Sequence, residues 1–151
     1  MDVPILRAHL WTGVSPLGRP SLGGVGIFYA PTKMARLGEI PHTPYYGTID
    51  ATPLFLILIG RHAAWTGQLT LFDELRGHID AALEWISKYG DLNGDGYVGY
   101  ASTSGKGLIN QGWKNSGDAI IDADGSLAMP PIALVEVQRY VYLAKRTLAE
   151  M

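Results

Sequence analysis

The hydrophobic positions between residues 70 and 90 repeat at the three- and four-residue steps of an amphipathic helix. They form one stripe, which consists of Leu71, Leu75, Ile79, Ala82, Leu83 and Ile86. Charged residues, among them Asp73 and Arg76, occupy the opposite face. The pattern therefore predicts a helix with one buried side, which Thr70 caps at its start and Gly90 ends.

A second helix is predicted just before this one, starting near Ala51. Residues 54–59 are apolar all round the helix, which implies burial on most sides. Asp50 or Thr52 can cap the N-terminus of this helix, and Gly67 ends it.

The remaining chain is divided between one more helix and long irregular segments. An amphipathic pattern predicts the last helix from Pro130 to the C-terminus. Residues 1–33 show no periodicity because prolines and glycines interrupt every window, so we expect coil there. Residues 91–117 form a polar, glycine-rich loop. With no strand and no repeat predicted, the fold class is all-α, in a single domain with long loops.

The amino-acid composition argues against several classes of function. Lys and Arg number 12 against 14 Asp and Glu, so the net charge of -2 gives no general attraction for nucleic acid or for an anionic membrane surface. The longest uncharged apolar stretch is about half of the ~20 residues that a membrane-spanning helix needs. The absence of cysteine excludes disulfides and thiolate chemistry and favours a cytoplasmic protein.

Residues 91–98 match the first part of a calcium-binding loop. Oxygen ligands fall at its positions 1, 3, 5 and 7, supplied by Asp91, Asn93, Asp95 and the carbonyl of Tyr97. Position 12 is Ser102 instead of a bidentate glutamate, and no second copy follows, which argues against a paired EF-hand. Two interpretations remain: a structural calcium site completed by a ligand from elsewhere, or a turn built from Asx hydrogen bonds without an ion.

A second loop, residues 110–118, has the composition of a sugar-binding site. Its candidate ligand-binding side chains are Gln111, Trp113, Lys114 and Asp118. Tryptophan can stack on the C–H face of a pyranose, and the polar groups can hydrogen-bond to hydroxyls. The same composition also fits a solvated loop anchored by one core tryptophan. The histidines have no metal-ligand spacing.

The order and spacing of several strings resemble one family, the bacterial glycogen-debranching proteins of the amylo-α-1,6-glucosidase type. The matching strings are residues 34–55, 65–67, 82–86, 91–98, 107–114 and 131–138. The resemblance covers 34–151 and excludes the irregular segment 1–33. It implies a six-hairpin glycosidase, an (α/α)6 toroid that hydrolyses α-glucosides with inversion. It also implies that Tyr46, Asp50 and the candidates of the second loop face the sugar, and that residues 91–98 bind calcium.

The chain departs from this family at the positions that matter for catalysis. An inverting glycosidase needs one carboxyl group as general acid and another as general base. The position of the family's acid is Asn115, whose amide cannot act as the acid, and Gly99 replaces a family glutamate. The family's base lies well downstream of the acid, beyond the residues present here.

Three functions therefore stay open: a glycoside hydrolase that is inactive as this chain, a non-catalytic carbohydrate-binding remnant, and a calcium-stabilised structural module. The predicted partner is an α-glucan or a small glucoside. The predicted helices are too few to close a six-hairpin ring. We therefore expect an incomplete toroid that associates with itself through uncovered apolar helices.

Overall fold

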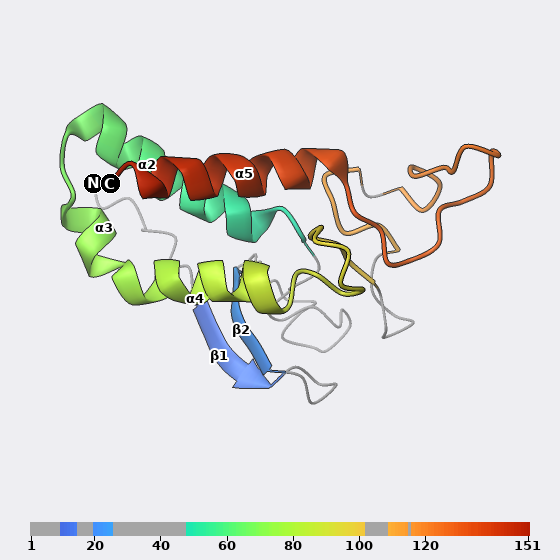
Figure 1. The fold of residues 1–151 in the computed structure, drawn as a ribbon, viewed down its shortest axis with the longest axis horizontal. Helices are drawn as coiled ribbons and strands as arrows, with labels where there is room; N and C mark the ends of the chain where they lie inside the picture. Colours follow the sequence, from blue (N-terminus) through green and yellow to red (C-terminus); the bar gives the residue numbers. More distant parts are fainter. Residues whose placement is uncertain (1–9, 15–19, 26–47, 102–108, 115) are drawn as a thin grey trace, which may run out of the picture.

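The computed structural model describes residues 10–14, 20–25, 48–101, 109–114 and 116–151. Figure 1 shows a chiefly helical arrangement with one small sheet among these residues. The elements in chain order are β1 (Leu10–Val14), β2 (Pro20–Val25), α2 (Ala51–Thr66), α3 (Thr70–Glu74), α4 (Arg76–Lys88) and α5 (Val135–Ala149).

Helices α2 and α5 lie side by side and run in the same direction (Figure 1). Their backbones approach closely where α2 carries Gly60, because a Cβ at this position would lie only 2.3 Å from Cγ2 of Thr147. Helix α4 runs in the opposite direction and lies against α2 (Figure 1). As a result, both α2 and α5 begin at the end of the molecule where the long loops gather.

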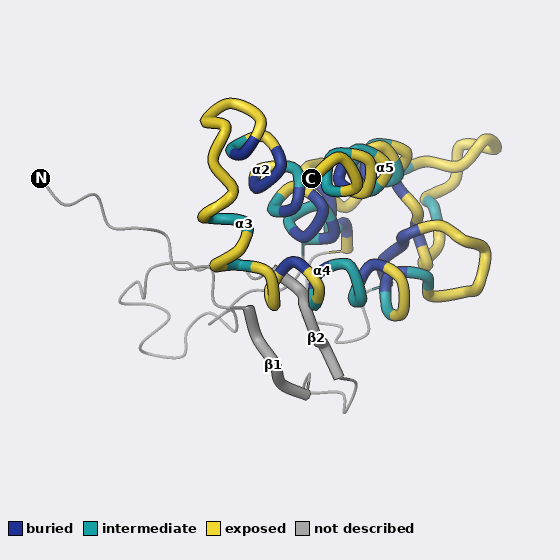
Figure 2. Tube along the Cα trace, turned by 60° about the vertical axis from the view of Figure 1, so that its left-hand side comes forward, coloured by how far each residue is buried: buried dark blue, intermediate teal, exposed yellow. Residues whose placement is uncertain are grey.

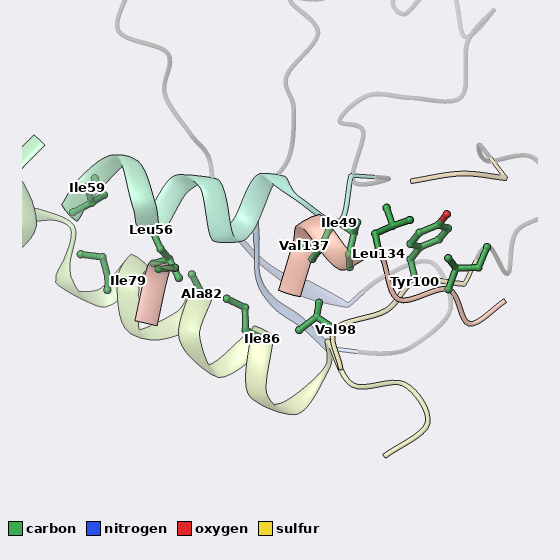
Figure 3. Packing of buried hydrophobic residues seen from close by; sticks show 12 residues of the cluster. Ile49, Leu56, Ile59, Ile79, Ala82, Ile86, Val98, Tyr100, Leu134 and Val137 are labelled. Atoms are coloured by element: carbon green, nitrogen blue, oxygen red, sulfur yellow. The ribbon is translucent and has the colours of Figure 1, made fainter. Parts of the chain in front are cut away.

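The core fills the space between these three helices and the loops that follow α4. Figure 3 shows its aliphatic side chains converging from α2, α4 and α5. Its buried members are Ile49, Leu56, Ile59, Ile79, Ala82, Ile86, Val98, Tyr100, Ile132, Leu134, Val137 and Ala144. The buried stripe predicted for residues 70–90 is thus confirmed at Ile79, Ala82 and Ile86, which belong to the core.

The sheet is an antiparallel pair in which Thr12 is opposite Leu22 and Val14 is opposite Pro20. Strand β2 lies beside α4 (Figure 1). The prediction of coil throughout residues 1–33 is therefore wrong for these two strands. Their main-chain pairing needs no side-chain alternation, and short strands containing glycine and proline give no period for a sequence pattern to detect.

The helix ends differ from the prediction at several points. Gly67 ends α2 in the left-handed conformation, as predicted, with φ of 68°. Asp50 stands at the N-cap of α2 but its side chain makes no capping hydrogen bond, and Thr52 lies inside the helix. The predicted middle helix breaks at Leu75 into α3 and α4, and Thr70 is the first residue of α3 and not a cap.

Helix α5 begins later than its sequence pattern predicts. It starts at Val135, whereas the prediction placed the start at Pro130. The reason is that Ile132 forms an antiparallel bridge with Tyr100, through N–H to O distances of 3.0 and 2.9 Å in the two directions. A tertiary contact therefore holds these residues extended, although their composition would suit a helix.

Burial around α2 is less complete than its apolar sequence implies. The inward positions, Leu56 and Ile59, are buried, but Leu58 is 66% exposed and Trp65 is 86% exposed. Figure 2 shows buried, intermediate and exposed positions alternating along this helix. The described part of the chain contains no helix that is long and apolar enough to cross a membrane.

Candidate functional site

Two loops meet at the end of the molecule where α2 and α5 begin (Figure 1). We call residues 91–98 the acidic loop and residues 109–118 the carboxamide loop. The acidic loop follows directly from α4, and the carboxamide loop lies against the start of α2. Asn115 and Tyr46, two of the predicted site residues, lie outside the described residues, as does Ser102.

The carboxamide loop is held in place by a buried asparagine. Asn110 is 2% exposed, and its Oδ1 accepts a hydrogen bond of 3.2 Å from the hydroxyl of Tyr100. Its Nδ2 donates to the carbonyl of Ser116, so one side chain ties the two ends of the loop together. Because a buried amide is costly unless it is bonded, this network fixes the loop against the core.

A backbone contact connects the same loop to the start of α2. The N–H of Ile49 donates to the carbonyl of Gln111 at 2.8 Å. The next residue, Gly112, is buried, and a Cβ there would lie 2.3 Å from Cδ1 of Leu134. The loop therefore packs closely on the segment before α5, and its backbone at Gln111 is bonded to the residue that precedes Asp50.

Asp50 is a half-buried carboxyl group with a perturbed acidity. Burial raises its pKa above the ordinary value, and the negative charge of Glu136 raises it further. Nearby backbone N–H groups oppose these two effects in part. Glu136 belongs to the first turn of α5 and was not among the predicted site residues. The sequence pattern predicts that Glu136 lies near the start of the last helix. It does not indicate that this residue interacts with Asp50.

Tyr100 also interacts electrostatically with Glu136. Burial raises the pKa of its phenol, and Glu136 contributes in the same direction. The backbone of Tyr100 is fixed by its bridge to Ile132. Its neighbour Val98 is clamped by Gln138, which accepts from the Val98 N–H at 2.9 Å and donates to the Val98 carbonyl at 2.8 Å. The phenol is thus held between two rigid segments.

The other predicted sugar-binding residues lie on the surface. Trp113 is 66% exposed, and the ammonium of Lys114 stands 5.4 Å from the centroid of its ring. Asp118 is exposed as well. The core anchor of the loop is Asn110, so the interpretation of Trp113 as a buried anchor is wrong. An exposed indole of this kind is free to contact a ligand.

The acidic loop is organised by its own hydrogen bonds. The carboxylate of Asp91 accepts from the N–H groups of Gly94 at 2.7 Å, Asp95 at 3.1 Å and Gly96 at 3.0 Å. These bonds lower the pKa of Asp91, the bond from Gly96 most of all. Asn93 donates from Nδ2 to Oδ2 of Asp95 at 2.9 Å. The loop therefore has the tight Asx-turn geometry that both sequence interpretations require.

The oxygen atoms of this loop are of the type that hard cations such as calcium prefer as ligands. Asp91, Asn93 and Asp95 carry side-chain oxygens on a largely exposed turn, and carboxylate oxygens that accept N–H bonds keep further lone pairs. Calcium takes six to eight oxygen ligands, so these three side chains alone are too few to complete its shell. No three His, Cys, Asp or Glu side chains gather into a metal-holding group anywhere in the described ranges.

A groove of about 700 Å³ runs along α5. Glu136, Arg139, Tyr140 and Tyr142 are among the residues that line it. Its volume lies in the range of small-molecule sites, which are mostly apolar with a few polar groups. Glu136 therefore both lines this groove and influences the acidity of Asp50.

No protein-family model matches the chain, and no curated protein matches it either.

Proposed function

We propose that the chain is part of a glycoside hydrolase of the glycogen-debranching type and that its loop end binds α-glucosides without hydrolysing them. The observation that carries this proposal is the backbone hydrogen bond from Ile49 to Gln111, which holds the residue before Asp50 against the carboxamide loop. The resemblance assigns the side chains of Asp50 and Gln111 to the sugar-facing pocket. On the same basis, α2, α4 and α5 are helices of an incomplete (α/α)6 ring.

The chemistry of the site favours binding over catalysis. Hydroxyl-rich ligands need side chains that donate and accept hydrogen bonds in fixed positions, and Gln111, Asp50 and the exposed Trp113 offer these functions. Catalysis by inversion needs a proton donor at position 115, where the chain has asparagine. Loss of general-acid catalysis commonly costs about 10²- to 10⁴-fold in rate.

Gly99 also favours binding over catalysis. A Cβ at this position would lie 3.3 Å from the carbonyl oxygen of Ile132, which is a tight approach to backbone atoms. The glutamate expected by resemblance would therefore need the bridge between Tyr100 and Ile132 to shift. Glycine at 99 thus suits the bridge and removes one carboxyl group from the loop end.

The test separates binding from turnover. We expect the chain to bind maltose, measured by isothermal titration calorimetry, and to release no reducing sugar from an α-1,6-linked glucan above a sample without protein. Gln111→Ala should weaken binding, whereas Gln68→Ala, on the link between α2 and α3, should not. Turnover by the wild-type chain would refute the inactive assignment, and absence of maltose binding would refute the site.

The acidic loop supports a second role, as a calcium-stabilised structural element. Asp91, Asn93 and Asp95 would hold the ion with side-chain oxygens and Tyr97 with its carbonyl. The bound ion would neutralise the loop's negative charges and tie it together beside the sugar site. In this role the ion would not take part in any reaction of the sugar.

We further propose that the protein works in the cytoplasm and associates with itself through the outer side of α2. Leu58 and Trp65 expose large apolar surfaces there. Such surfaces drive association when they form a continuous patch. Light scattering at micromolar concentration should show particles larger than one chain, and Leu58→Glu should reduce their size. A single monomeric peak for the wild type would contradict this expectation.

A further inference from the structure

The contact between Gly60 and Thr147 sets the register of α2 against α5. Asp50 precedes Gly60 by ten residues, and Glu136 precedes Thr147 by eleven. At a rise of about 1.5 Å per residue, each separation is roughly 15 Å of helix. Because the two helices run in parallel, this register places the two carboxyl groups at the same level on neighbouring elements. Their electrostatic interaction agrees with that placement.

The framework around this pair is rigid. Gln138, one turn away from the start of α5, holds the Val98 backbone with two hydrogen bonds and also donates to the carbonyl of Leu134 at 3.0 Å. Tyr100 is fixed by its backbone bridge and by its bond to Asn110. Side chains that are supported in this way can keep a ligand-binding geometry without a large loss of entropy on binding.

The groove along α5 is an independent observation beside this pair. Glu136 lines it together with Tyr140 and Tyr142, so one wall offers a carboxyl group and aromatic faces. Aromatic faces pack on the C–H side of a sugar ring, and a carboxyl group binds its hydroxyls. The volume of about 700 Å³ is sufficient for a small ligand.

We propose that Glu136 contacts the ligand directly and that Glu136 and Asp50 together bind two neighbouring hydroxyl groups of a neutral sugar, whose ring packs along Tyr140. This inference rests on the proposed function and adds a residue to the site. Carboxylate oxygens accept hydrogen bonds from hydroxyl groups, and the negative charges of Glu136 and Asp50 would repel an anionic ligand.

The experiment compares the full chain with Glu136→Gln, which keeps the shape of the side chain and removes its ability to ionise. Maltose is the neutral probe, glucose 6-phosphate is the anionic one, and binding is measured by calorimetry. Glu74→Gln is the matched control, because Glu74 is an exposed glutamate on α3, at the opposite end of the molecule (Figure 1). We expect Glu136→Gln to weaken maltose binding at least tenfold, Glu74→Gln to leave it unchanged, and the wild type to prefer maltose to glucose 6-phosphate.

A second measurement follows the carboxyl group of Asp50 by NMR as a function of pH. Glu136→Gln should lower the titration midpoint of Asp50, because it removes the neighbouring negative charge, whereas Glu74→Gln should not. This readout needs no sugar, and a role of Glu136 in packing alone would not produce it. If Glu136→Gln does not fold, Glu136→Asp replaces it in both measurements, with a smaller loss of maltose affinity expected from the shorter side chain.

The outcomes separate this inference from the proposed function. Equal maltose affinity of the wild type and the Glu136 variant would overturn the role of Glu136 and leave the sugar site standing. A titration midpoint of Asp50 that does not change would overturn the pairing of the two carboxyl groups. Absence of maltose binding by the wild-type chain, or a preference for glucose 6-phosphate, would overturn the inference, and absence of binding would also overturn the proposed function.

Discussion

The acidic loop and the carboxamide loop are similarly polar, but they are built in opposite ways. The acidic loop is shaped from within, because the carboxylate of Asp91 accepts three backbone N–H groups of the same loop. The carboxamide loop is shaped from outside, by Tyr100, Ile49 and the segment before α5. A loop of the first kind can keep its geometry alone, whereas one of the second kind depends on the surrounding fold.

The largest expected difference between the loops concerns their asparagines. Asn110→Ala should lower the free energy of unfolding by about 2–3 kcal/mol, because it leaves the hydroxyl of Tyr100 and the carbonyl of Ser116 without their partner in a buried place. Asn93→Ala, on the exposed acidic loop, should change it by about 0.5 kcal/mol or less. Urea unfolding measures both values. Equal losses would show that the two loops depend on the fold to the same extent.

Calcium should act on the acidic loop and leave the rest of the chain unaffected. If the ion binds there, millimolar calcium raises the melting temperature, and a concentration of 100 times Kd stabilises the fold by about 2.7 kcal/mol. Asp95→Ala should abolish the rise. Asp124→Ala is the control, because Asp124 is an exposed aspartate that bonds to Ser126 in a different turn. A melting curve that chelator does not change would leave the loop as a hydrogen-bonded turn.

The smallest expected effect concerns how the free energy of unfolding changes with pH. Two aspartates should contribute to this change with opposite signs. Asp50 has a pKa raised above 3.8 in the folded chain by burial and by Glu136, so the folded state binds the extra proton and stability falls as pH rises from 3.8 through the raised value. Asp91 has a pKa lowered from 3.8 by its N–H bonds, so its contribution is present above 3.8 and is lost as pH falls through the lowered value.

Substitution by asparagine tests each sign separately. Asp50→Asn should remove the loss of stability on raising the pH, and Asp91→Asn should remove part of the loss on lowering it. Urea unfolding between pH 3 and 7 measures both. The charged group that influences Asp50 is Glu136, which also influences Tyr100. No change in Tyr100 ionisation is expected in this range because its pKa is raised from 10.0. Two profiles of the same sign would show that the aspartates do not differ in environment.

The sequence predicted what depends on neighbouring residues along the chain. The helical periods of α4 and α5 are visible because each of these helices buries one side. Gly67 was recognised as the end of α2 because a left-handed C-terminus favours glycine. The turn at residues 91–98 was also recognised, because aspartate and asparagine bond to the backbone within a few residues.

Other features were decided by contacts between distant residues, and no local pattern encodes those contacts. The late start of α5 follows from the bridge of Ile132 with Tyr100, and the pairing of β1 with β2 needs only main-chain groups. Asp50 was expected to cap α2, but its side chain makes no capping bond, and its acidity is set by burial and by Glu136. The sequence alone determined which side chains could bind a sugar or an ion, and the packing of α2 against α5 decided that Glu136 stands beside Asp50.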